Sequence, residues 1–525
     1  MELLMMSAAD VAIVAVYLVF VLWWGFRHGK SADSQSYFLA GRSMSWRVVG
    51  LSLFAASISS TTLIGQSGDA YDTGLAVYNY NLTGMVVMVC FAVFLLPLYI
   101  RSGIFTIPEF LEKRFDSRSR YYFSFICIVG NIFLDAAGAL YAAALIIKLI
   151  VPEANLQWIV FAFALFAASY TIPGGLSSVI NTELIQAVVL LVGSILLTIL
   201  CFRQGGDYFY SLYASDDLLV KLIRPLTDTA TPWLGLIVGM PVLGIYFWAN
   251  NQTLVQRVLS ARSVDEGRKG VLFAGFLTML TLFIIAMPGV IARHLFPGLE
   301  RPDMVYPTMI LRLASVGVMG LLIAALLSAL TSALSAIMNS ASTLFTMDFY
   351  AKVDRHASSA RLVAVGKVVA CVAIVLAALW APQIGKFGSL LKYYQEMLSY
   401  LSPPIVAAFL LGIFGRRVNG QGVFVGLLGG LVVAVGLLFF KSQIFGDLHF
   451  LLMVPFLLGF SGLLMYVVSR FSPAPAPEKL ADTVFSWRDL AEEFRAHRGK
   501  PWYTFYLWWA VLLLLLSAVI WTVFS

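Results

Sequence analysis

Charged residues are scarce in this sequence. Only 12% of its 525 residues are Asp, Glu, Lys or Arg, whereas 60% are hydrophobic, and the mean hydropathy is +0.87. Water-soluble domains carry roughly twice this share of charge. A soluble fold of this length cannot bury so much apolar surface, because the buried fraction rises only slowly with chain length. The scarcity of charge therefore indicates that lipid solvates most of the chain.

Other features of catalytic or cofactor-binding proteins are also missing. The sequence has no nucleophile–base set, phosphate-binding loop or cluster of metal ligands, so we do not expect an enzyme. The four cysteines lie inside apolar runs without pairing or metal-site spacing, and we interpret them as small hydrophobic residues: Cys90, Cys127, Cys201 and Cys371. The net charge of +7 comes mainly from short loops between apolar runs, which excludes nucleic acid as the expected partner.

Long apolar runs dominate what is present. A membrane-spanning helix needs about 20 apolar residues. The first run has no basic region or cleavage site before it, so we expect a retained span and not a signal peptide. The sequence predicts an all-α polytopic membrane protein with about 14 transmembrane helices, at 8–26, 46–69, 78–100, 121–150, 156–172, 179–202, 234–256, 270–292, 315–346, 362–381, 389–414, 421–440, 448–469 and 503–524.

The loops between these runs alternate in charge. Positively charged loops stay in the cytoplasm, and here they follow the first, third, seventh and eleventh spans, which places both termini outside. Residues 204–232 are expected to form an outer loop. We expect a single membrane domain over 1–471, a Pro/Ala-rich cytoplasmic linker over 472–500, and a terminal transmembrane helix within 501–525.

Two spans contain polar runs that favour an interrupted helix. The second span contains the run 55–62, rich in Ser and Thr, and the seventh contains the run 248–253. In lipid a broken helix survives only where it lines a cavity, and paired breaks in corresponding spans mark a transporter's binding site. The alternative interpretation is that the Ser and Thr side chains join packed helices.

Further polar groups lie inside other spans. The ninth span has five polar residues on one helix face, which suits either a cation site or a packing seam: Ser328, Ser332, Ser335, Asn339 and Ser342. Asp135 lies in the middle of a span, where a carboxylate is costly and usually functional. Glu183 lies near the start of the sixth span, where it is either functional or merely solvated.

Several short stretches resemble the solute:sodium symporter family, in particular its sodium/glucose cotransporter branch and the sugar- and sialic-acid-type bacterial relatives. They extend over residues 10 to 470: Tyr37-Phe38-Leu39-Ala40-Gly41-Arg42, Ile107-Pro108-Glu109-Phe110, Gly174-Gly175-Leu176-Ser177, Gln256-Arg257, Asn339-Ser340, Phe345-Thr346-Met347-Asp348, Tyr394-Gln395-Glu396 and Ser402-Pro403-Pro404. The resemblance implies a five-plus-five inverted-repeat (amino acid/sodium symporter-like) core, with repeats at 46–202 and 234–414.

The resemblance also implies a sodium site. Its matching positions are the carbonyls of Ala55, Ile58 and Ala329 together with the Ser332 hydroxyl. The family's second hydroxyl falls on Ala333, which has none, and Thr331 or Ser335 could replace it. Glu183 stands where the family has an Asp associated with a further or transient ion site. Sodium is the expected coupling ion, and a proton carried by Glu183 or Asp135 is the alternative.

The implied solute site differs from that of the branch. Asn251 and Gln395 match its Asn and Gln, whereas Thr62, Asn81 and Thr278 replace its Gln, Glu and Lys. Ser59 belongs to a hydroxyl run shared with the sialic-acid subgroup.

Asp135 stands where a sialic-acid relative carries Arg. A carboxylate there repels an anion, so we expect a neutral sugar, amino sugar or polyol. The aromatic residues Tyr78, Tyr80 and Trp248 are expected to stack on a ring. We predict a symporter in a plasma membrane such as a bacterial inner membrane, with an uncoupled sensor or facilitator as the alternative.

Overall fold

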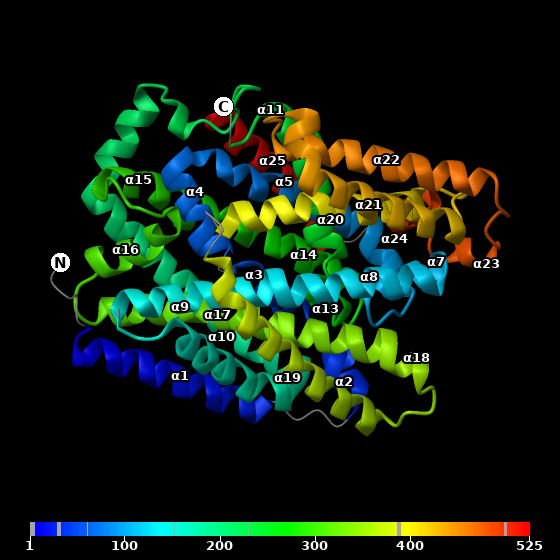
Figure 1. The fold of residues 1–525 in the computed structure, drawn as a ribbon, viewed down its shortest axis with the longest axis horizontal. Coiled ribbons are helices and arrows are strands. Elements are labelled where there is room, and N and C mark those ends of the chain that lie inside the picture. The colour runs from blue at the N-terminus through cyan, green and yellow to red at the C-terminus, as the bar shows by residue number, and fades with distance from the viewer. Residues whose placement is uncertain are drawn as a thin grey trace.

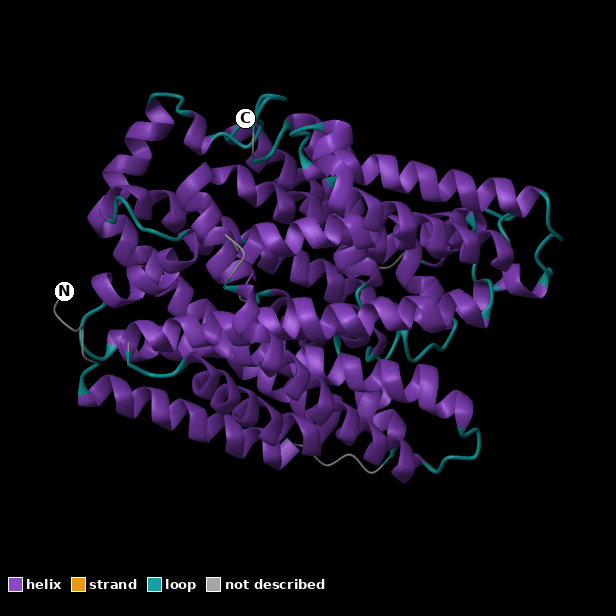
Figure 2. Cartoon of the chain, viewed as in Figure 1, coloured by secondary structure: helices purple, strands orange, loops and turns teal. Residues whose placement is uncertain are grey.

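The computed structural model describes residues 6–28, 33–59, 61–151, 153–228, 230–385, 390–497 and 501–525. In these ranges every named element is a helix and no strand occurs (Figure 2). The long helices run side by side along the long axis of the molecule, and the loops gather at its two ends (Figure 1). A helix satisfies its backbone hydrogen bonds internally, so this is an arrangement that lipid can surround.

Among the described residues, twelve helical stretches are long and apolar enough to cross a membrane, and a bent pair supplies a thirteenth. Their principal helices are α1 (Ala8–His28), α5 (Asn79–Cys90) with α6 (Leu96–Arg101), α8 (Ser117–Val129) with α9 (Ala137–Ile150), α10 (Leu156–Ala214), α11 (Trp233–Val238) with α12 (Met240–Ile245), α14 (Val264–Met279) with α15 (Met287–Leu295), α17 (Val318–Leu344), α19 (Ser359–Ile384), α20 (Leu390–Phe414), α21 (Gly420–Phe445), α22 (Phe450–Arg470) and α25 (Tyr506–Val523). The bent pair contains α3 (Trp46–Ser57) and α4 (Gln66–Thr73), and the helix direction changes by 59° between its two halves.

Helix α10 contains two of the predicted spans. Its 59 residues amount to about 90 Å of helix, roughly three times the thickness of the hydrocarbon core. Pro173 and Gly175 interrupt it, and Gly175 has φ 59°, where an added Cβ would lie 2.6 Å from the Tyr37 carbonyl oxygen. The predicted division between spans 156–172 and 179–202 is therefore confirmed. The helix continues to Ala214, so the expectation of a loop throughout 204–232 is wrong.

Shorter helices connect and cap the spans. They are α2 (Ser34–Leu39), α7 (Ile107–Arg114), α13 (Gln252–Leu259), α16 (Val305–Leu313), α18 (Ala351–Val353), α23 (Glu478–Ala481) and α24 (Trp487–Ala496), with short 3₁₀ turns η1 (Ala40–Arg42), η3 (Leu75–Tyr78), η6 (Leu218–Val220), η9 (Pro302–Met304) and η11 (Trp502–Thr504). The predicted linker contains α23 and α24. Arg268 of α14 and Arg101 of α6 form ion pairs with α24, through Glu493 at 2.8 Å and Asp489 at 2.7 Å respectively. The linker is thus bound to the membrane domain.

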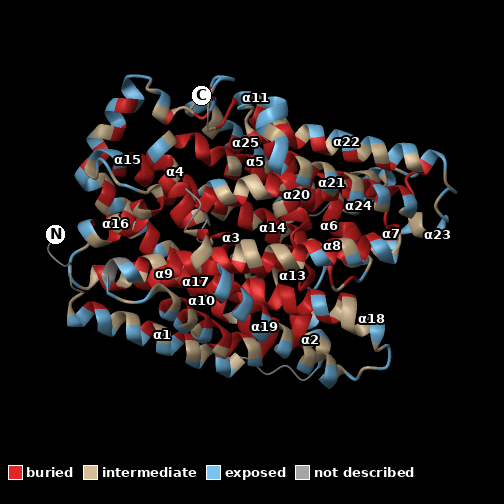
Figure 3. Ribbon diagram, in the orientation of Figure 1, coloured by how far each residue is buried: buried red, intermediate tan, exposed pale blue. Residues whose placement is uncertain are grey.

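Burial separates a central helix from a lipid-facing shell. Helix α17 lies in the middle of the bundle and is almost entirely buried (Figures 1 and 3). Helices α1, α21 and α25 instead expose apolar side chains on one side, such as Val16 (69%), Val432 (71%) and Leu515 (60%). Exposed apolar surface on this scale requires an apolar solvent. The chain is therefore a multi-pass membrane protein.

Six π-helical turns interrupt the spans of the described chain: η2 (Thr61–Gly65), η4 (Phe91–Leu95), η5 (Gly130–Ala136), η7 (Tyr246–Asn250), η8 (Leu282–Ala286) and η10 (Phe345–Tyr350). Such turns widen the backbone locally and are frequent at functional sites. Asp135 lies in η5 and Trp248 lies in η7. Both residues were singled out from the sequence, and both occupy helices whose regular bonding is broken.

Candidate functional site

The first interrupted helix breaks at hydroxyl side chains. Helix α3 ends at Ser57, and Ile58 leaves the helical region with φ −85° and ψ 81°. The Ser57 hydroxyl donates to the Phe54 carbonyl at 2.8 Å, and the Thr62 hydroxyl donates to the Ser57 carbonyl at 2.9 Å. The second bond gives the Ser57 carbonyl a donor at the break, whereas the Phe54 carbonyl also accepts from the Ile58 N–H at 3.1 Å. The predicted interruption of the second span is confirmed.

The second interrupted helix breaks at an asparagine. Asn251 is extended, with φ −72° and ψ 118°, between η7 and α13. Its side-chain oxygen accepts from the Thr253 N–H at 2.8 Å and so caps α13. The predicted break in the seventh span is also confirmed. The two breaks face a shared space, because residues from both line the same cavities.

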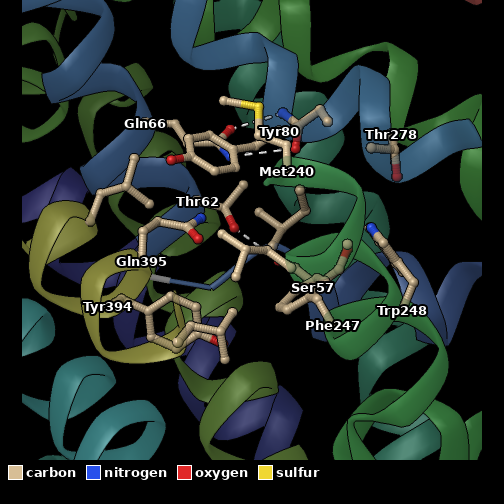
Figure 4. Close-up of a pocket in the computed structure, with 16 residues that line it drawn as sticks. Ser57, Thr62, Gln66, Tyr80, Met240, Phe247, Trp248, Thr278, Tyr394 and Gln395 are labelled. Atoms are coloured by element: carbon tan, nitrogen blue, oxygen red, sulfur yellow. Dashed lines mark hydrogen bonds between the residues drawn. The ribbon is translucent and has the colours of Figure 1, made fainter. Parts of the chain in front are cut away.

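A central cavity of about 650 Å³ lies between these breaks (Figure 4). Four of the predicted solute-binding residues line it: Thr62, Asn81, Thr278 and Gln395. They come from the first interrupted helix, α5, α14 and α20, so the fold brings together residues from both predicted repeats.

The central cavity combines amides with aromatic rings. The Asn81 amide donates to Gln66 Oε1 and to Thr281 Oγ1, each at 2.9 Å, while Gln395 Oε1 is buried and has no hydrogen-bond partner among the described residues. Tyr80 and Trp248 line the cavity as predicted. The prediction for Tyr78 is wrong, because its hydroxyl donates to the Met279 carbonyl at 3.1 Å and its ring is buried.

Gln66 is a cavity residue that the sequence argument missed. It lies four residues after Thr62, which places both side chains on one face of the helix that begins at the break. Its amide forms a reciprocal pair with Asn81, with bonds of 2.9 and 3.4 Å. The helical spacing from Thr62 was the signal that could have identified it.

A second cavity of about 430 Å³, here called the lower cavity, holds the other predicted solute residues, Ser59, Asp135 and Asn251. Ser57, Phe247 and Tyr394 line both cavities and therefore lie between them, as Figure 4 shows at the edge of the central cavity. The structure thus divides the predicted solute-binding set into two groups, four residues around the central cavity and three around the lower cavity.

A vestibule of about 1640 Å³ adjoins the central cavity on the other side and shares Tyr80, Leu391 and Gln395 with it. Four acidic residues and two lysines line the vestibule: Asp69, Asp72, Glu396, Asp447, Lys392 and Lys441. The excess of carboxylates attracts cations. The three spaces form one sequence along the bundle, from the vestibule through the central cavity to the lower cavity.

Three of the predicted sodium-site residues, Ala55, Ala329 and Ser332, meet at one point. The Ser332 hydroxyl of α17 lies 3.1 Å from the carbonyl oxygens of both Ala55 and Ala329, and Ile58 follows at the break in the first interrupted helix. Oxygen atoms from a break and a facing helix suit a hard cation. Ala333, next to Ser332, lines the lower cavity and adds no oxygen from its side chain. The residues present fit a sodium ion with one hydroxyl fewer than the family pattern.

The suggested replacements for the missing hydroxyl are engaged elsewhere. The Ser335 hydroxyl bonds to Tyr170 at 2.7 Å and to Thr171 at 2.8 Å, both on α10. The Thr331 hydroxyl accepts from Gln186 at 2.9 Å. Both side chains therefore join α17 to α10, as the packing interpretation of the polar seam proposed.

Other members of the seam also contact neighbouring helices. Ser328 donates to Tyr17 of α1 at 2.6 Å, and Ser342 donates to the Gly366 carbonyl of α19 at 2.7 Å. Of the four serines in the seam, Ser332 is the one whose hydroxyl bonds to the interrupted helix. The seam combines one ion-site candidate with packing contacts.

Glu183 forms a buried ion pair. Its carboxylate binds Arg257 of α13 through Oε1 at 2.5 Å and Oε2 at 3.2 Å, and Ser52 of α3 donates to it as well. Both charged side chains are fully buried. The structure therefore places Glu183 between α10, α3 and α13, and both of its carboxylate oxygens accept hydrogen bonds. The alternative interpretation, that Glu183 is a solvated carboxylate at the membrane interface, is wrong. Arg257 is a partner that the sequence argument did not identify.

Comparisons with known proteins agree with this geometry. Residues 37–430 match the model of the sodium:solute symporter family. The human sodium/myo-inositol cotransporter is 32% identical over 91% of this chain and 76% of its own length. The zebrafish (Danio rerio) sodium/glucose cotransporter 4 is 33% identical over 95% of this chain and 84% of its own length.

Solved structures show the same fold. A sodium-coupled sialic acid symporter in a substrate-bound outward-open state has a TM-score of 0.78, with 22% identity over 89% of this chain and 99% of that one. Mhp1, a nucleobase-cation-symport-1 family transporter, has a TM-score of 0.59 with 16% identity, covering 86% of this chain and 99% of that one. The predicted inverted-repeat fold class is confirmed, and the relatives are transporters and not enzymes. The chain belongs to the sodium:solute symporter family.

Proposed function

We propose that this symporter takes up a neutral, polyhydroxylated solute, such as a neutral sugar, amino sugar or polyol, in the central cavity. One observation carries the proposal. The described lining of that cavity consists of amide, hydroxyl, aromatic and aliphatic side chains, with no Asp, Glu, Lys or Arg. A charged solute would lose its hydration there without gaining a countercharge, whereas hydroxyl groups find donors and acceptors. Relatives named for glucose and myo-inositol support the same chemical class.

Unpaired polar atoms and ring faces give the solute its contacts. Gln395 Oε1 is a buried acceptor to which no residue in the described part of the chain donates, an arrangement that costs about 1–3 kcal/mol until a donor arrives. A solute hydroxyl would be that donor. Thr62, Thr278 and the amide pair at Asn81 offer further donors and acceptors. Trp248 provides an aromatic surface for the apolar face of a sugar or polyol.

Sodium is proposed to bind at Ala55, Ile58, Ala329 and Ser332, one helical turn from the solute-facing residues of the same interrupted helix. The convergence of Ser332 with two of the carbonyls supports this assignment. The excess of carboxylates in the vestibule supports entry of the sodium ion from that side.

We propose that the chain resides in a plasma membrane, such as a bacterial inner membrane, with both termini outside. The basic loops support this orientation. Helices α7 and α18 and their basic neighbours lie at the end of the bundle opposite the N-terminus (Figure 1). Residues Lys113, Arg114 and Lys352 belong to these helices. Labelling of single cysteines near each terminus with a membrane-impermeant reagent in intact cells tests the orientation.

The function is tested in proteoliposomes. Uptake of radiolabelled glucose, myo-inositol and sialic acid is measured under an inward sodium gradient, under an inward proton gradient, and without a gradient. We expect sodium-driven accumulation of a neutral solute and none of sialic acid. Accumulation driven only by protons, or equilibration without accumulation, contradicts the proposal.

A matched pair of variants tests the location of the solute. Gln395→Ala removes the unpaired acceptor, and we expect the solute KM to rise at least 5-fold at saturating sodium. Gln421→Ala removes an exposed glutamine at the start of α21 and should leave KM unchanged. Equal effects, or none, would show that the solute does not bind in the central cavity.

A further inference from the structure

Asp135 has a carboxylate without a cationic partner. It lines the lower cavity together with Tyr394. No Lys, Arg or His among the described residues forms an ion pair with it, although Glu183 and Asp348, other carboxylates inside the bundle, are paired with arginine. A carboxylate at membrane depth without a countercharge is expensive. A mobile cation is the chemistry that would compensate it.

The position that lacks the sodium-site hydroxyl lines this same cavity. Ala333 and Asp135 face the lower cavity together with Ala56 and Ser59, the neighbours in sequence of the carbonyl residues Ala55 and Ile58. Ser332 precedes Ala333, and its hydroxyl contacts the carbonyl oxygens of Ala55 and Ala329. The site short of one neutral ligand and the unpaired carboxylate therefore meet in one space of about 430 Å³.

We infer that Asp135 belongs to the sodium site and compensates for Ala333: its carboxylate binds the bound sodium ion across the lower cavity, directly or through one water molecule. This inference rests on the proposed placement of sodium at Ser332 and deepens it. It also moves Asp135 from the predicted solute set to the ion. A carbonyl-and-hydroxyl site attracts sodium by dipoles alone, whereas a carboxylate adds a full countercharge in a low-dielectric space.

The residues at positions 135 and 333 are therefore expected to have coupled effects on sodium binding. A hydroxyl at position 333 and a carboxylate at position 135 supply the same need, so restoring one should matter most when the other is absent. Residues that contribute to one site give non-additive effects, and a double-mutant cycle measures them. Asp135→Asn keeps the shape of the side chain and removes its charge, and Ala333→Ser adds the family's missing hydroxyl.

The experiment measures half-saturating sodium at constant ionic strength and saturating solute, and, without solute, sodium-dependent thermal stabilisation of the purified protein. We expect Asp135→Asn to raise half-saturating sodium at least 10-fold, with the solute KM at saturating sodium changed less than 3-fold. Ala333→Ser should recover at least 5-fold in that background and gain about 2-fold in the wild type. The control Ala341→Ser places a hydroxyl two turns further along α17, and it should recover nothing.

Three outcomes overturn the inference. Unchanged sodium affinity in Asp135→Asn removes the carboxylate from the ion site, and a change confined to solute KM assigns it to the solute. Equal gains from Ala333→Ser in both backgrounds show that the positions are independent. If Asp135→Asn does not fold, Ala333→Ser alone decides, because unchanged or weaker sodium binding there means that position 333 does not face the ion. Solute KM in Gln395→Ala tests the solute cavity separately.

Discussion

Ser332→Ala removes the side-chain oxygen that lies closest to the interrupted helix. The hydroxyl shares its hydrogen bond between the carbonyls of Ala55 and Ala329, each at 3.1 Å, so its lone pairs can bind an ion between them. Losing one such oxygen costs on the order of 1–2 kcal/mol of sodium binding, by analogy with hydrogen bonds to charged groups. This corresponds to about 5–30-fold weaker binding. Position 333 carries no hydroxyl, and the hydroxyls of Thr331 and Ser335 bond to α10, so no neighbouring hydroxyl replaces the lost oxygen.

The assay is the initial rate of solute uptake as a function of sodium at fixed pH and ionic strength. Ser342→Ala is the matched control, because its hydroxyl donates to the Gly366 carbonyl of α19, away from the break. We expect half-saturating sodium to rise 5–30-fold in Ser332→Ala and to stay unchanged in Ser342→Ala. If Ser332→Ala keeps the wild-type value, or if both variants shift equally, Ser332 is not a sodium ligand.

Two further perturbations address the aromatic side of the central cavity and the buried ion pair of Glu183. Gly84→Ala would place a Cβ 2.5 Å from Trp248 Nε1, so the indole must move; we expect a several-fold higher solute KM with unchanged half-saturating sodium, and an unchanged KM would show that this ring does not contact solute. Glu183→Gln leaves the fully buried Arg257 without its countercharge, which should lower stability by about 3–5 kcal/mol, and the additional change Arg257→Met should recover part of this loss in thermal unfolding. A double variant no more stable than Glu183→Gln would contradict the ion-pair argument.

The sequence predicted the helices well because lipid imposes a strong and simple pattern. An apolar run of about 20 residues has few alternatives to a spanning helix, and the fourteen predicted ranges correspond to helical stretches once α10 is divided at Gly175. The two interrupted helices were also predictable. The runs at Ser57 and Asn251 place several polar residues inside apolar spans, where a continuous helix surrounded by lipid would leave them without partners.

The partners of buried polar side chains were less predictable. Hydroxyl spacing placed Ser328, Ser332 and Ser335 on one helix face, but it could not say that they contact three different helices. Glu183 was identified as an ionisable residue, whereas its pairing with Arg257 depends on how two distant helices pack. Local pattern gives the face of a helix, and tertiary packing decides what that face meets.

The break after Ser57 has a thermodynamic consequence. The same few residues carry Ala55, which we propose binds the ion, and Thr62, which lines the central cavity, so ordering this turn for one ligand would order it for the other. Linkage then requires reciprocity: whatever factor sodium adds to solute affinity, the solute must add to sodium affinity. Stoichiometric coupling does not need a signal passed between separate sites, because a single turn of backbone belongs to both equilibria. The strength of coupling then depends on how much conformational freedom each ligand removes from the described residues on either side of the break.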